Sequence, residues 1–474
     1  MFSHSENDYA KKRKQLLSMS FDKSAYSAVH YLYDLFIRDI FQQLVHVTNN
    51  SFRLGGDSPF SNVSLFCRET LIKTFADAKY PDWTSPVDNL EEIIHLQKIF
   101  ADFIAKGSPI TGKNYKFPIV TVNIAVNSEG KIVDNEFFEY IARLNAKRGN
   151  FNFHIGERIA TCCRLTQSLK DLRKSIRSDT YGNGGVSIGS HRVININLHG
   201  IACDAVHQNL DFNALLLQYM DYAEKLLIAH KEHLKDVIKT GVLKFFRIGW
   251  QDINMFFSTF GFVGLWDAYN VLSSAKIFAG KYEEFASSTI KLMEKYAQEA
   301  SIRNEDYAFN VEETPAENAS PKLAAIDNYW YKDCSWYTSL KLLSNQMIPV
   351  YEEYDAFDRL EIMGKLMNDV SGGAMCHFNI DGSMTEESSV KLTRMMIEEF
   401  KIPHFAIEIG TSTCKKEHTS IGVHQICPEC GAEIDTWTRR IVGYNSDTKD
   451  WIAVRRDWEN LRRKIYKINK ESLQ

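Results

Sequence analysis

The feature that most constrains the fold is an alternation of short apolar runs with longer helical segments along the first 400 residues. Residues 60–66, 117–126 and 193–198 are expected strands, and the run at 117–126 is typical of a strand buried on both faces. Apolar residues at helical spacing lie between and after these runs, most clearly at 208–240. One face of that helix carries Phe212, Leu215, Leu216, Tyr219, Met220, Leu226 and Leu227. This alternation predicts an α/β architecture.

The sequence beyond residue 400 has a different character. Cysteines cluster there, helical periodicity lapses, and the chain from Thr448 onward is charged, with Trp451 and Trp458 interleaved. We therefore expect a small module separate from the first 400 residues. We interpret the basic residues of the tail as the solvated face of a helix rather than as a docking site. These residues are Arg455, Arg456, Arg462, Arg463 and Lys464.

Charge and cysteine content exclude several classes of protein. The 474 residues carry a formal net charge of −4, so no nucleic-acid polymer is expected as a partner. No apolar run approaches the roughly 20 residues of a membrane helix, and the N-terminus lacks a secretory signal. The number of cysteines, nine, is odd, and two of them are adjacent in the sequence. These features predict thiol chemistry or metal binding in a reducing cytoplasm, without a membrane partner.

Metal-ligating side chains cluster in the segment CKKEHTSIGVHQICPECG, which begins at Cys414. Cys427 and Cys430 form a C-x-x-C knuckle, whose tight turn directs two thiolates at one ion, and Cys414 with one histidine completes a tetrahedral Cys3His zinc site. We prefer His418 as the fourth ligand and keep His424 in reserve. A redox C-x-x-C is the alternative, but it requires a strand-to-helix context that the sequence does not show. The expected zinc is structural.

A second motif, RRIVGYNSD at 439–447, follows this cluster and contains Gly443. It resembles the radical loop of glycyl radical enzymes, Arg-Val-x-Gly-Tyr. A zinc knuckle just ahead of that loop is similar to the arrangement in anaerobic (class III) ribonucleoside-triphosphate reductases. Further segments match this family in the family's order, from about residue 20 to the end of the chain. They lie at 52–65, 160–169, 185–198, 258–268, 312–320, 342–350 and 371–382.

The resemblance implies radical chemistry at two residues. Gly443 would carry the radical, because a glycyl α-carbon radical is stabilised by the flanking amide nitrogen and carbonyl, and a side chain would twist that geometry. Cys163, immediately before Arg164, would relay it as a thiyl radical, with Cys162 as the runner-up. Without the resemblance, both cysteines are interpreted as small buried hydrophobic residues.

The resemblance also implies reduction of ribonucleoside triphosphates for DNA precursor synthesis. The thiyl radical removes the 3′ hydrogen of the ribose, the 2′ hydroxyl leaves as water, and formate or a thiol protein acts as reductant. For substrate binding we single out Thr314, Ala316 and Ser320, in a TPAENAS turn before an expected helix, and Asn62 on an expected strand. The alternatives are an ordinary helix cap with Pro in its first turn, and a satisfied buried amide.

By the same resemblance, residues 1–400 are a catalytic α/β barrel, 401–435 a zinc-binding module, and 436–474 the radical loop and tail. The expected fold is the ten-stranded barrel of ribonucleotide reductases and pyruvate formate-lyase, incomplete at its N-terminus. The family's nucleotide-sensing region and first barrel strand have no counterpart here, so a separate N-terminal fragment of the same enzyme is an expected partner. A homodimer and a radical S-adenosylmethionine activase are also implied.

The chain departs from the family at two motifs. The radical loop reads Ile-Val-Gly where the family usually has Val-Cys-Gly or Val-Ser-Gly, and the first zinc pair is Cys-x-x-x-His where relatives more often show Cys-x-x-Cys or Cys-x-x-His. Two alternative functions stay open: another glycyl radical enzyme of the formate-lyase type, and a non-catalytic zinc-binding structural protein. The zinc knuckle and the TPAE segment argue against the first, and the net charge and the ordered motifs argue against the second.

Overall fold

The computed structural model describes residues 23–50, 60–76, 78–156, 158–160, 166–168, 189–249, 251–305, 307–440 and 443–467. For residues 23–30, 158–160 and 166–168 it describes the backbone alone. Cys162 and Cys163, the two candidates for the thiyl radical, lie outside the described residues. None of the described helices is long and apolar enough to cross a membrane.

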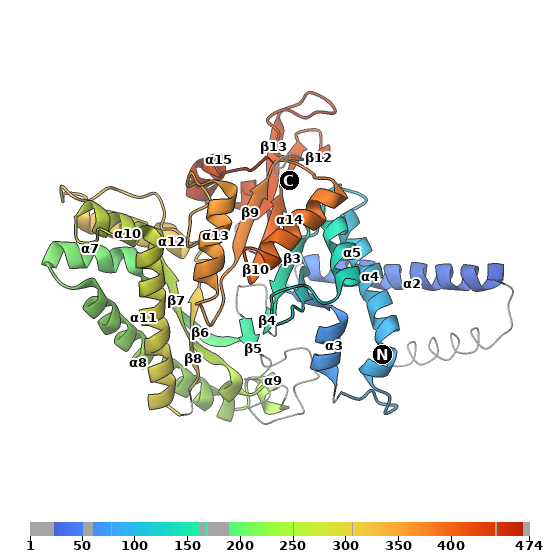
Figure 1. Cartoon of the computed structure of the whole chain (residues 1–474), viewed down its shortest axis with the longest axis horizontal. Helices are drawn as coiled ribbons and strands as arrows, with labels where there is room; N and C mark the ends of the chain where they lie inside the picture. Colours follow the sequence, from blue (N-terminus) through green and yellow to red (C-terminus); the bar gives the residue numbers. More distant parts are fainter. Residues whose placement is uncertain are drawn as a thin grey trace.

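A five-stranded sheet forms one half of the central wall. Its order is β1 (Asn62–Phe66), β2 (Ile119–Ile124), β3 (Phe151–Ile155), β10 (His404–Ile409) and β9 (Cys376–Ile380). β1, β2 and β3 are parallel, β10 is antiparallel to β3, and β9 is parallel to β10. The helices α4 (Leu90–Lys106), α5 (Asn135–Asn145) and α14 (Glu386–Glu398) lie on its outer side (Figure 1). All residues of β2 are buried, which confirms the prediction for this strand.

A three-stranded parallel sheet forms the other half. It contains β6 (Ser190–Asn197), β7 (Phe257–Val263) and β8 (Phe309–Glu313), surrounded by α7 (Leu198–Gln208), α8 (Phe212–Lys239), α10 (Leu265–Ser274) and α11 (Tyr282–Arg303). Glu312 of β8 forms a β-bridge with Gly373, just ahead of β9. A Cβ atom on Gly372 would lie 2.5 Å from the Val311 carbonyl oxygen, so this close approach requires glycine. The two sheets are thereby joined into one wall.

The register of the five-stranded sheet separates a polar face from an apolar one. Ser64, Thr121 and Asn152 lie in one row across β1, β2 and β3. Successive side chains of a strand point to opposite faces, and the next residues along, Val122 and Phe153, belong to the main hydrophobic core beneath the helices. The polar row therefore lies on the side of the wall that faces away from these helices.

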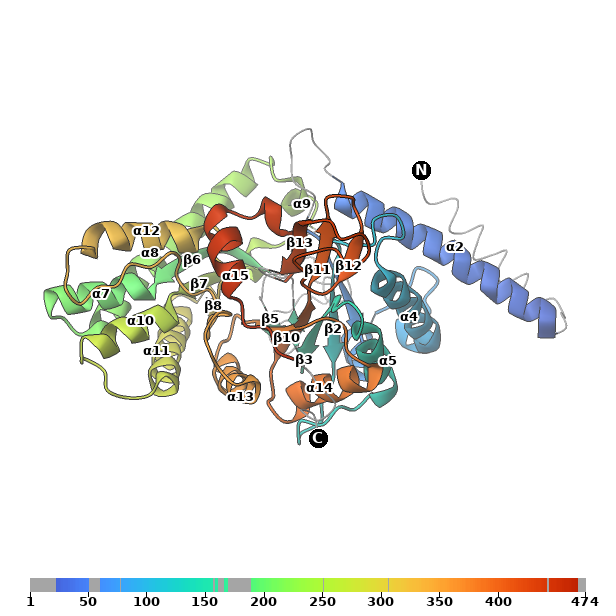
Figure 2. The same ribbon diagram turned by 90° about the horizontal axis from the view of Figure 1, so that it is seen from above.

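A second, antiparallel sheet lies above the wall, in the order β12 (Thr419–Ile421), β11 (Thr411–Cys414), β13 (Ile434–Arg440) and β14 (Asn445–Asp447). Figure 2 shows it between the helices around β6–β8 and those around β1–β3. Only Gly410 separates β10 from β11. The predicted division at 400/401 and 435/436 stays a prediction. The structure adds that β10 belongs to the central wall and that β13 crosses the second boundary.

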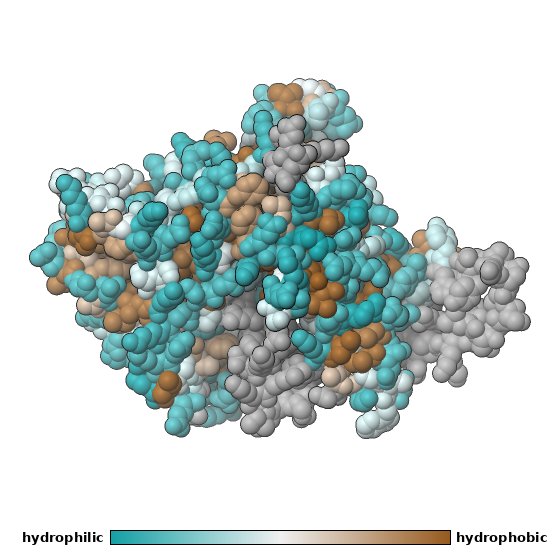
Figure 3. Space-filling model, in the orientation of Figure 1, coloured by the Kyte–Doolittle hydropathy of each residue, from teal (hydrophilic) through white to brown (hydrophobic). Residues whose placement is uncertain are grey.

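The remaining elements connect and flank these sheets. They are α2 (Lys23–Asn49), α3 (Arg68–Phe75), η1 (Pro86–Asn89), β4 (Arg158–Ala160), β5 (Thr166–Ser168), α9 (Lys244–Arg247), η2 (Ile253–Met255), α12 (Ala319–Tyr331), α13 (Ala356–Met367), η3 (Thr448–Asp450), η4 (Arg455–Glu459) and α15 (Asn460–Arg462). On α8, the predicted apolar face is too wide, because Tyr219 is 41% exposed and Leu226 is 60% exposed. Figure 3 shows a largely hydrophilic surface with separated apolar patches.

Candidate functional site

The first candidate site is a cluster of four side chains in the C-terminal sheet. Cys414 ends β11, His418 lies in the turn before β12, and Cys427 and Cys430 lie in the loop before β13. The amide of Gly431 donates to the Cys427 carbonyl oxygen, which closes the knuckle. One potential ligand atom from each of the four side chains lies within 4.8 Å of all the others.

The geometry of this cluster fits zinc. The Sγ atoms of Cys414 and Cys430 are 3.8 Å apart, and Cys427 Sγ lies 4.0 Å from His418 Nδ1. Two thiolates on one tetrahedral zinc are expected about 3.8 Å apart, given a Zn–S bond near 2.3 Å. His424, the reserve candidate, is not in the cluster, because its Nε2 atom bonds the carbonyl oxygen of Ile421 at 2.8 Å.

The second candidate site is the turn that contains Gly443, between β13 and β14. Gly443 is buried, and its carbonyl oxygen accepts hydrogen bonds from Arg440 Nη1 at 3.0 Å and from Asn152 Nδ2 at 3.2 Å. Arg440 also donates to Asn152 Oδ1 and, through Nη2, to the Gly149 carbonyl oxygen at 2.8 Å. The turn therefore lies against the polar face of β3.

A buried network of ionised groups supports this turn. Glu408 of β10 accepts from Arg439 at 2.8 Å and lies 3.3 Å from Arg463. Glu459 pairs with both Arg463 and Arg455. Burial alone would raise the pKa of each glutamate, but the neighbouring arginines hold both pKa values below the ordinary range.

The interpretation of the tail as a solvated face is wrong for two of its five residues. Arg455 and Arg463 are buried in this network. Arg456, Arg462 and Lys464 are exposed or half-buried, as predicted. The physical reason is pairing: a buried guanidinium is tolerated when carboxylates and carbonyl oxygens accept its hydrogen bonds.

The TPAENAS segment lies against the Gly443 turn. Tyr444 packs its ring against Phe60 and Phe117, with ring centroids 5.1 and 5.4 Å away, and its hydroxyl lies 3.4 Å from Glu317 Oε1. Arg455 Nε donates to the Glu317 carbonyl oxygen at 2.9 Å. Two contacts to Glu317, from Tyr444 and from Arg455, thus hold the residues after Thr314 beside the glycine turn.

The hydroxyl groups predicted to bind substrate make hydrogen bonds inside the protein. Thr314 Oγ1 donates to Asn195 Oδ1 at 2.6 Å, and Ser320 donates to the Leu343 carbonyl oxygen. Ala316 has a φ of 43°, which L-residues rarely adopt. The helix α12 begins only at Ala319, so Pro315 is not in its first turn.

Asn62 lies on the polar side of β1 and is half-buried. Its Oδ1 atom accepts from Thr121 Oγ1 at 3.0 Å, and its Nδ2 atom lies 3.4 Å from Ser64 Oγ, at the limit of a hydrogen bond. The amide therefore has one firm partner and one weak one. The amide nitrogen is the side-chain atom of Asn62 with the weaker hydrogen bond.

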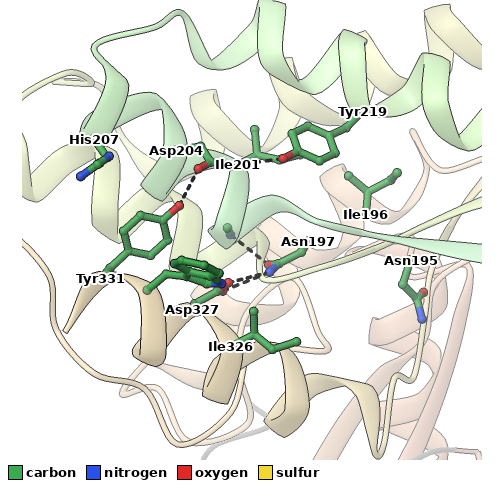
Figure 4. Close-up of a pocket in the computed structure, with 12 residues that line it drawn as sticks. Asn195, Ile196, Asn197, Ile201, Asp204, His207, Tyr219, Ile326, Asp327 and Tyr331 are labelled. Atoms are coloured by element: carbon green, nitrogen blue, oxygen red, sulfur yellow. Dashed lines mark hydrogen bonds between the residues drawn. The ribbon is translucent and has the colours of Figure 1, made fainter.

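A cavity of about 510 Å³ opens at the C-terminal end of β6. Figure 4 shows Tyr331 pointing at Asp204 and Asn197 pointing at Asp327 across its wall. Lysine and arginine are absent from the described residues that line it, so a polyphosphate would find acidic groups and little to neutralise it. Asn195 connects the cavity to Thr314. The sequence analysis did not single out these residues.

Two residues that contact the Gly443 turn were also missed. Asn152 and Gly149 lie 291 positions ahead of the residues that they bond, Gly443 and Arg440. A signal for Asn152 exists in the sequence, since FNFHI alternates apolar and polar residues as a half-buried strand does, although no strand was predicted there. Nothing in the sequence indicates which distant glycine it would contact.

Comparison with known proteins gives consistent results. A family model described as anaerobic ribonucleoside-triphosphate reductase matches residues 10–466. A solved anaerobic ribonucleotide reductase is 25% identical, with a TM-score of 0.77 over 92% of this chain and 68% of that chain. The anaerobic ribonucleotide reductase from Thermotoga maritima in complex with dATP and CTP is 25% identical, with a TM-score of 0.72 over 88% of this chain and 67% of that chain. The search of curated proteins found no match.

These likenesses confirm the predicted fold class, an α/β fold of the ribonucleotide reductase type. A third structure, of the Thermotoga maritima enzyme with glycerol in the active site, agrees in fold, with a TM-score of 0.76 at 24% identity over 90% of this chain and 69% of that chain. The family match favours neither alternative left open by the sequence, a formate-lyase or a non-catalytic zinc protein.

Proposed function

Because the chain belongs to the anaerobic ribonucleoside-triphosphate reductase family and so is an oxidoreductase that reduces ribonucleotides, we propose that Gly443 carries its radical. The observation that carries this proposal is the position of the Gly443 turn. The glycine is buried against the polar face of β3, and its carbonyl oxygen has two donors, Asn152 from that strand and Arg440 at the end of β13, three residues before the glycine. A radical at this position would be shielded from solvent and would lie against the polar side of the central wall.

The relay that we propose is Cys163, with Cys162 as the runner-up. Both follow β3 in the chain, and Asn152 in the same strand contacts Gly443. Gly443 would take hydrogen from the thiol, and the resulting thiyl would take the 3′ hydrogen of the ribose. The 2′ hydroxyl would then leave as water with the proton of the 3′ hydroxyl, and formate or a thiol protein would supply two electrons, which are taken up with two protons. The cysteine would return the 3′ hydrogen, and the thiyl so formed would regenerate the Gly443 radical.

The substrate that we propose is a ribonucleoside triphosphate. Backbone N–H groups of residues 316–319 would bind its phosphates, because they lie ahead of α12 and at its first residue, where no carbonyl of the helix accepts them. Ser320 and Pro321 would not contribute, since the N–H of Ser320 donates to the Ala316 carbonyl oxygen and proline has no N–H. Thr314 and Ser320 would hold this segment in shape through their internal hydrogen bonds. Asn62 would reach the substrate through its side-chain amide.

The metal that we propose for Cys414, His418, Cys427 and Cys430 is a structural zinc. A bound zinc would cross-link the β11–β12 turn to the loop before β13, without a role in the reaction. We further propose a cytoplasmic homodimer activated by a radical S-adenosylmethionine enzyme. The chain spans about two thirds of the length of the solved relatives, and a separate N-terminal fragment stays a prediction.

The decisive experiment is electron paramagnetic resonance after anaerobic incubation of the full chain with a cognate activase and reductant. Wild type should give a doublet, and Gly443→Ala should give none. A doublet that persists in Gly443→Ala would assign the radical to another residue, and its absence from wild type would contradict the proposal.

A further inference from the structure

We propose that Arg440 and Asn152 are positioning residues for the radical, holding the Gly443 carbonyl oxygen in one place and polarising it. This inference rests on the proposed function, since it takes Gly443 as the radical-bearing residue. It assigns a role to two side chains that would contact neither the nucleotide nor the metal.

The two donors come from different elements. Arg440 is the last residue of β13, whereas Asn152 is the second residue of β3 in the central wall. Arg440 is 2% exposed and Asn152 is fully buried. Water therefore does not compete for the Gly443 carbonyl oxygen, and both hydrogen bonds act in a medium of low dielectric constant.

The orientation of the Asn152 amide follows from its two partners. Arg440 has only donors, so the Asn152 atom that it contacts must be the acceptor Oδ1. The remaining atom, Nδ2, must then be the donor that lies 3.2 Å from the Gly443 carbonyl oxygen. Arg440 thus acts on Gly443 in two ways, by a direct hydrogen bond and by fixing the neighbouring amide.

The Arg440 side chain also ties the turn to the wall. Its Nη2 atom donates to the Gly149 carbonyl oxygen, in the turn that precedes β3. Gly149 has a φ of +60°, and a Cβ atom there would lie 2.3 Å from the Ile407 carbonyl oxygen. This anchor therefore sits on backbone that only glycine can form. Arg440 and Asn152 therefore fix the position of the Gly443 turn relative to β3. In the sequence, β3 precedes the segment that contains Cys162 and Cys163.

The charge on Arg440 persists under working conditions. Burial lowers the pKa of its guanidinium to about 10, which still leaves it protonated at neutral pH. The Gly443 carbonyl oxygen therefore faces a permanent positive charge. A charge-assisted hydrogen bond of this kind is roughly twice as strong as a neutral one.

These contacts bear directly on a glycyl radical. The unpaired electron on the α-carbon is shared with the adjacent carbonyl only while the two groups stay coplanar, and fixing the carbonyl oxygen fixes that plane. Donors at the oxygen also favour the resonance form with negative charge on the oxygen and spin on the amide nitrogen, and so draw spin density away from the α-carbon. Loss of a donor should therefore leave more spin on the α-carbon, and the doublet splitting from the α-hydrogen should widen.

The test uses the full chain, activated anaerobically, with variants Arg440→Lys and Asn152→Asp. Each should lower the radical yield per chain by about tenfold, as expected for loss of one charge-assisted or buried hydrogen bond, and widen the remaining doublet. The matched controls are Arg456→Lys, an exposed arginine paired with Asp457, and Asn150→Asp, a buried amide that donates to the Ile104 carbonyl oxygen. Both controls should keep the wild-type spectrum and yield.

Folding is monitored by thermal unfolding and by bound zinc. If Arg440→Lys does not fold, the spectrum of Asn152→Asp decides. If the folded variants give the wild-type doublet splitting and radical yield, the inference is overturned. The proposed function would still stand in that case, because a glycyl doublet would have been observed. Absence of a doublet from wild type, or its persistence in Gly443→Ala, would instead overturn the proposed function.

Discussion

The two ends of β13 are built in opposite ways. Before its first residue lies the cluster of Cys414, His418, Cys427 and Cys430, and beyond its last residue lies the Gly443 turn. The seven residues of the strand span about 23 Å at the usual rise of a strand. The cluster draws its ligands from one short segment, whereas the turn is held by residues from the central wall. Ligands from one short segment would need a bound metal to hold them together, whereas the Gly443 turn already has hydrogen-bond partners in the central wall.

The largest expected effect comes from removing a metal ligand. Cys430→Ser should lower zinc affinity by more than the roughly 10- to 100-fold expected when a residue that only hydrogen-bonds a ligand is changed, because it removes a ligand outright. His424→Ala is the matched control, since His424 lies outside the cluster, and it should keep full zinc. Zinc per chain after dialysis against a weak chelator measures both. Equal loss in the two variants would contradict the ligand set.

The next effect tests the opposite end of the strand. Glu408→Gln leaves Arg439 buried without a carboxylate, whereas Arg463 keeps its pair with Glu459, so the chain should be destabilised by roughly 3 kcal/mol, the lower end of the range for a broken buried ion pair. Urea unfolding measures the change. Glu433→Gln, at the metal end, removes only an exposed pair with Lys415 and should leave the midpoint nearly unchanged. If the two variants unfold at similar urea concentrations, the buried ion pairs near Gly443 contribute no more to stability than the exposed pair near the metal cluster.

Acid should weaken the Gly443 end through the same carboxylates. The pKa values of Glu408 and Glu459 are lower in the folded chain than the ordinary value near 4.3, so their stabilisation is present above that pH. It is lost as pH falls through the lowered folded values. Unfolding free energy measured from pH 6 to pH 3 should fall less steeply in Glu408→Gln than in wild type. Parallel curves would show that Glu408 does not contribute.

The smallest effect is expected at the tyrosine beside the glycine. Tyr444→Phe removes a 3.4 Å contact with Glu317 and keeps the ring packed against Phe60 and Phe117. Stability should change by about 0.5 kcal/mol or less, and the radical yield should stay at the wild-type level. Thermal unfolding and the paramagnetic resonance signal measure the two. A large loss of radical would assign the hydroxyl a role of its own.

The same contrast explains what the sequence could predict. The α/β alternation and the Cys427–Cys430 knuckle are local patterns, and the structure confirms the fold class and brings the four predicted ligands together. The contact between Asn152 and Gly443 could not be predicted. Side-chain periodicity shows which face of a strand is polar, but it does not show which distant segment packs against that face. The width of the buried face of α8 was overestimated at Tyr219 and Leu226, because helical spacing alone does not show how much of a helix its neighbours cover.

The charged tail was misinterpreted for a related reason. Arg455 and Arg463 look like surface residues in a run of basic side chains. Their partners include Glu408, in a central strand far away in the sequence, and Glu459, one helical turn from each of them. Composition could not distinguish solvated charges from paired ones, since both give the same residue types. The pairing depends on which strand the tail returns to.

The junction at Gly410 has a consequence for protein engineering. β10 is a central strand with neighbours on both sides, and a single glycine later the chain becomes β11 of the C-terminal sheet. A Cβ atom on Gly410 would lie 2.8 Å from a methyl carbon of Val423, so the crossing is also sterically tight. A fragment that starts at 401 would carry β10 without its neighbours β3 and β9, and one that starts at 411 would begin at the first residue of β11, an inner strand of the C-terminal sheet. The C-terminal sheet is therefore not a portable module that can be grafted or exchanged by cutting between the two strands.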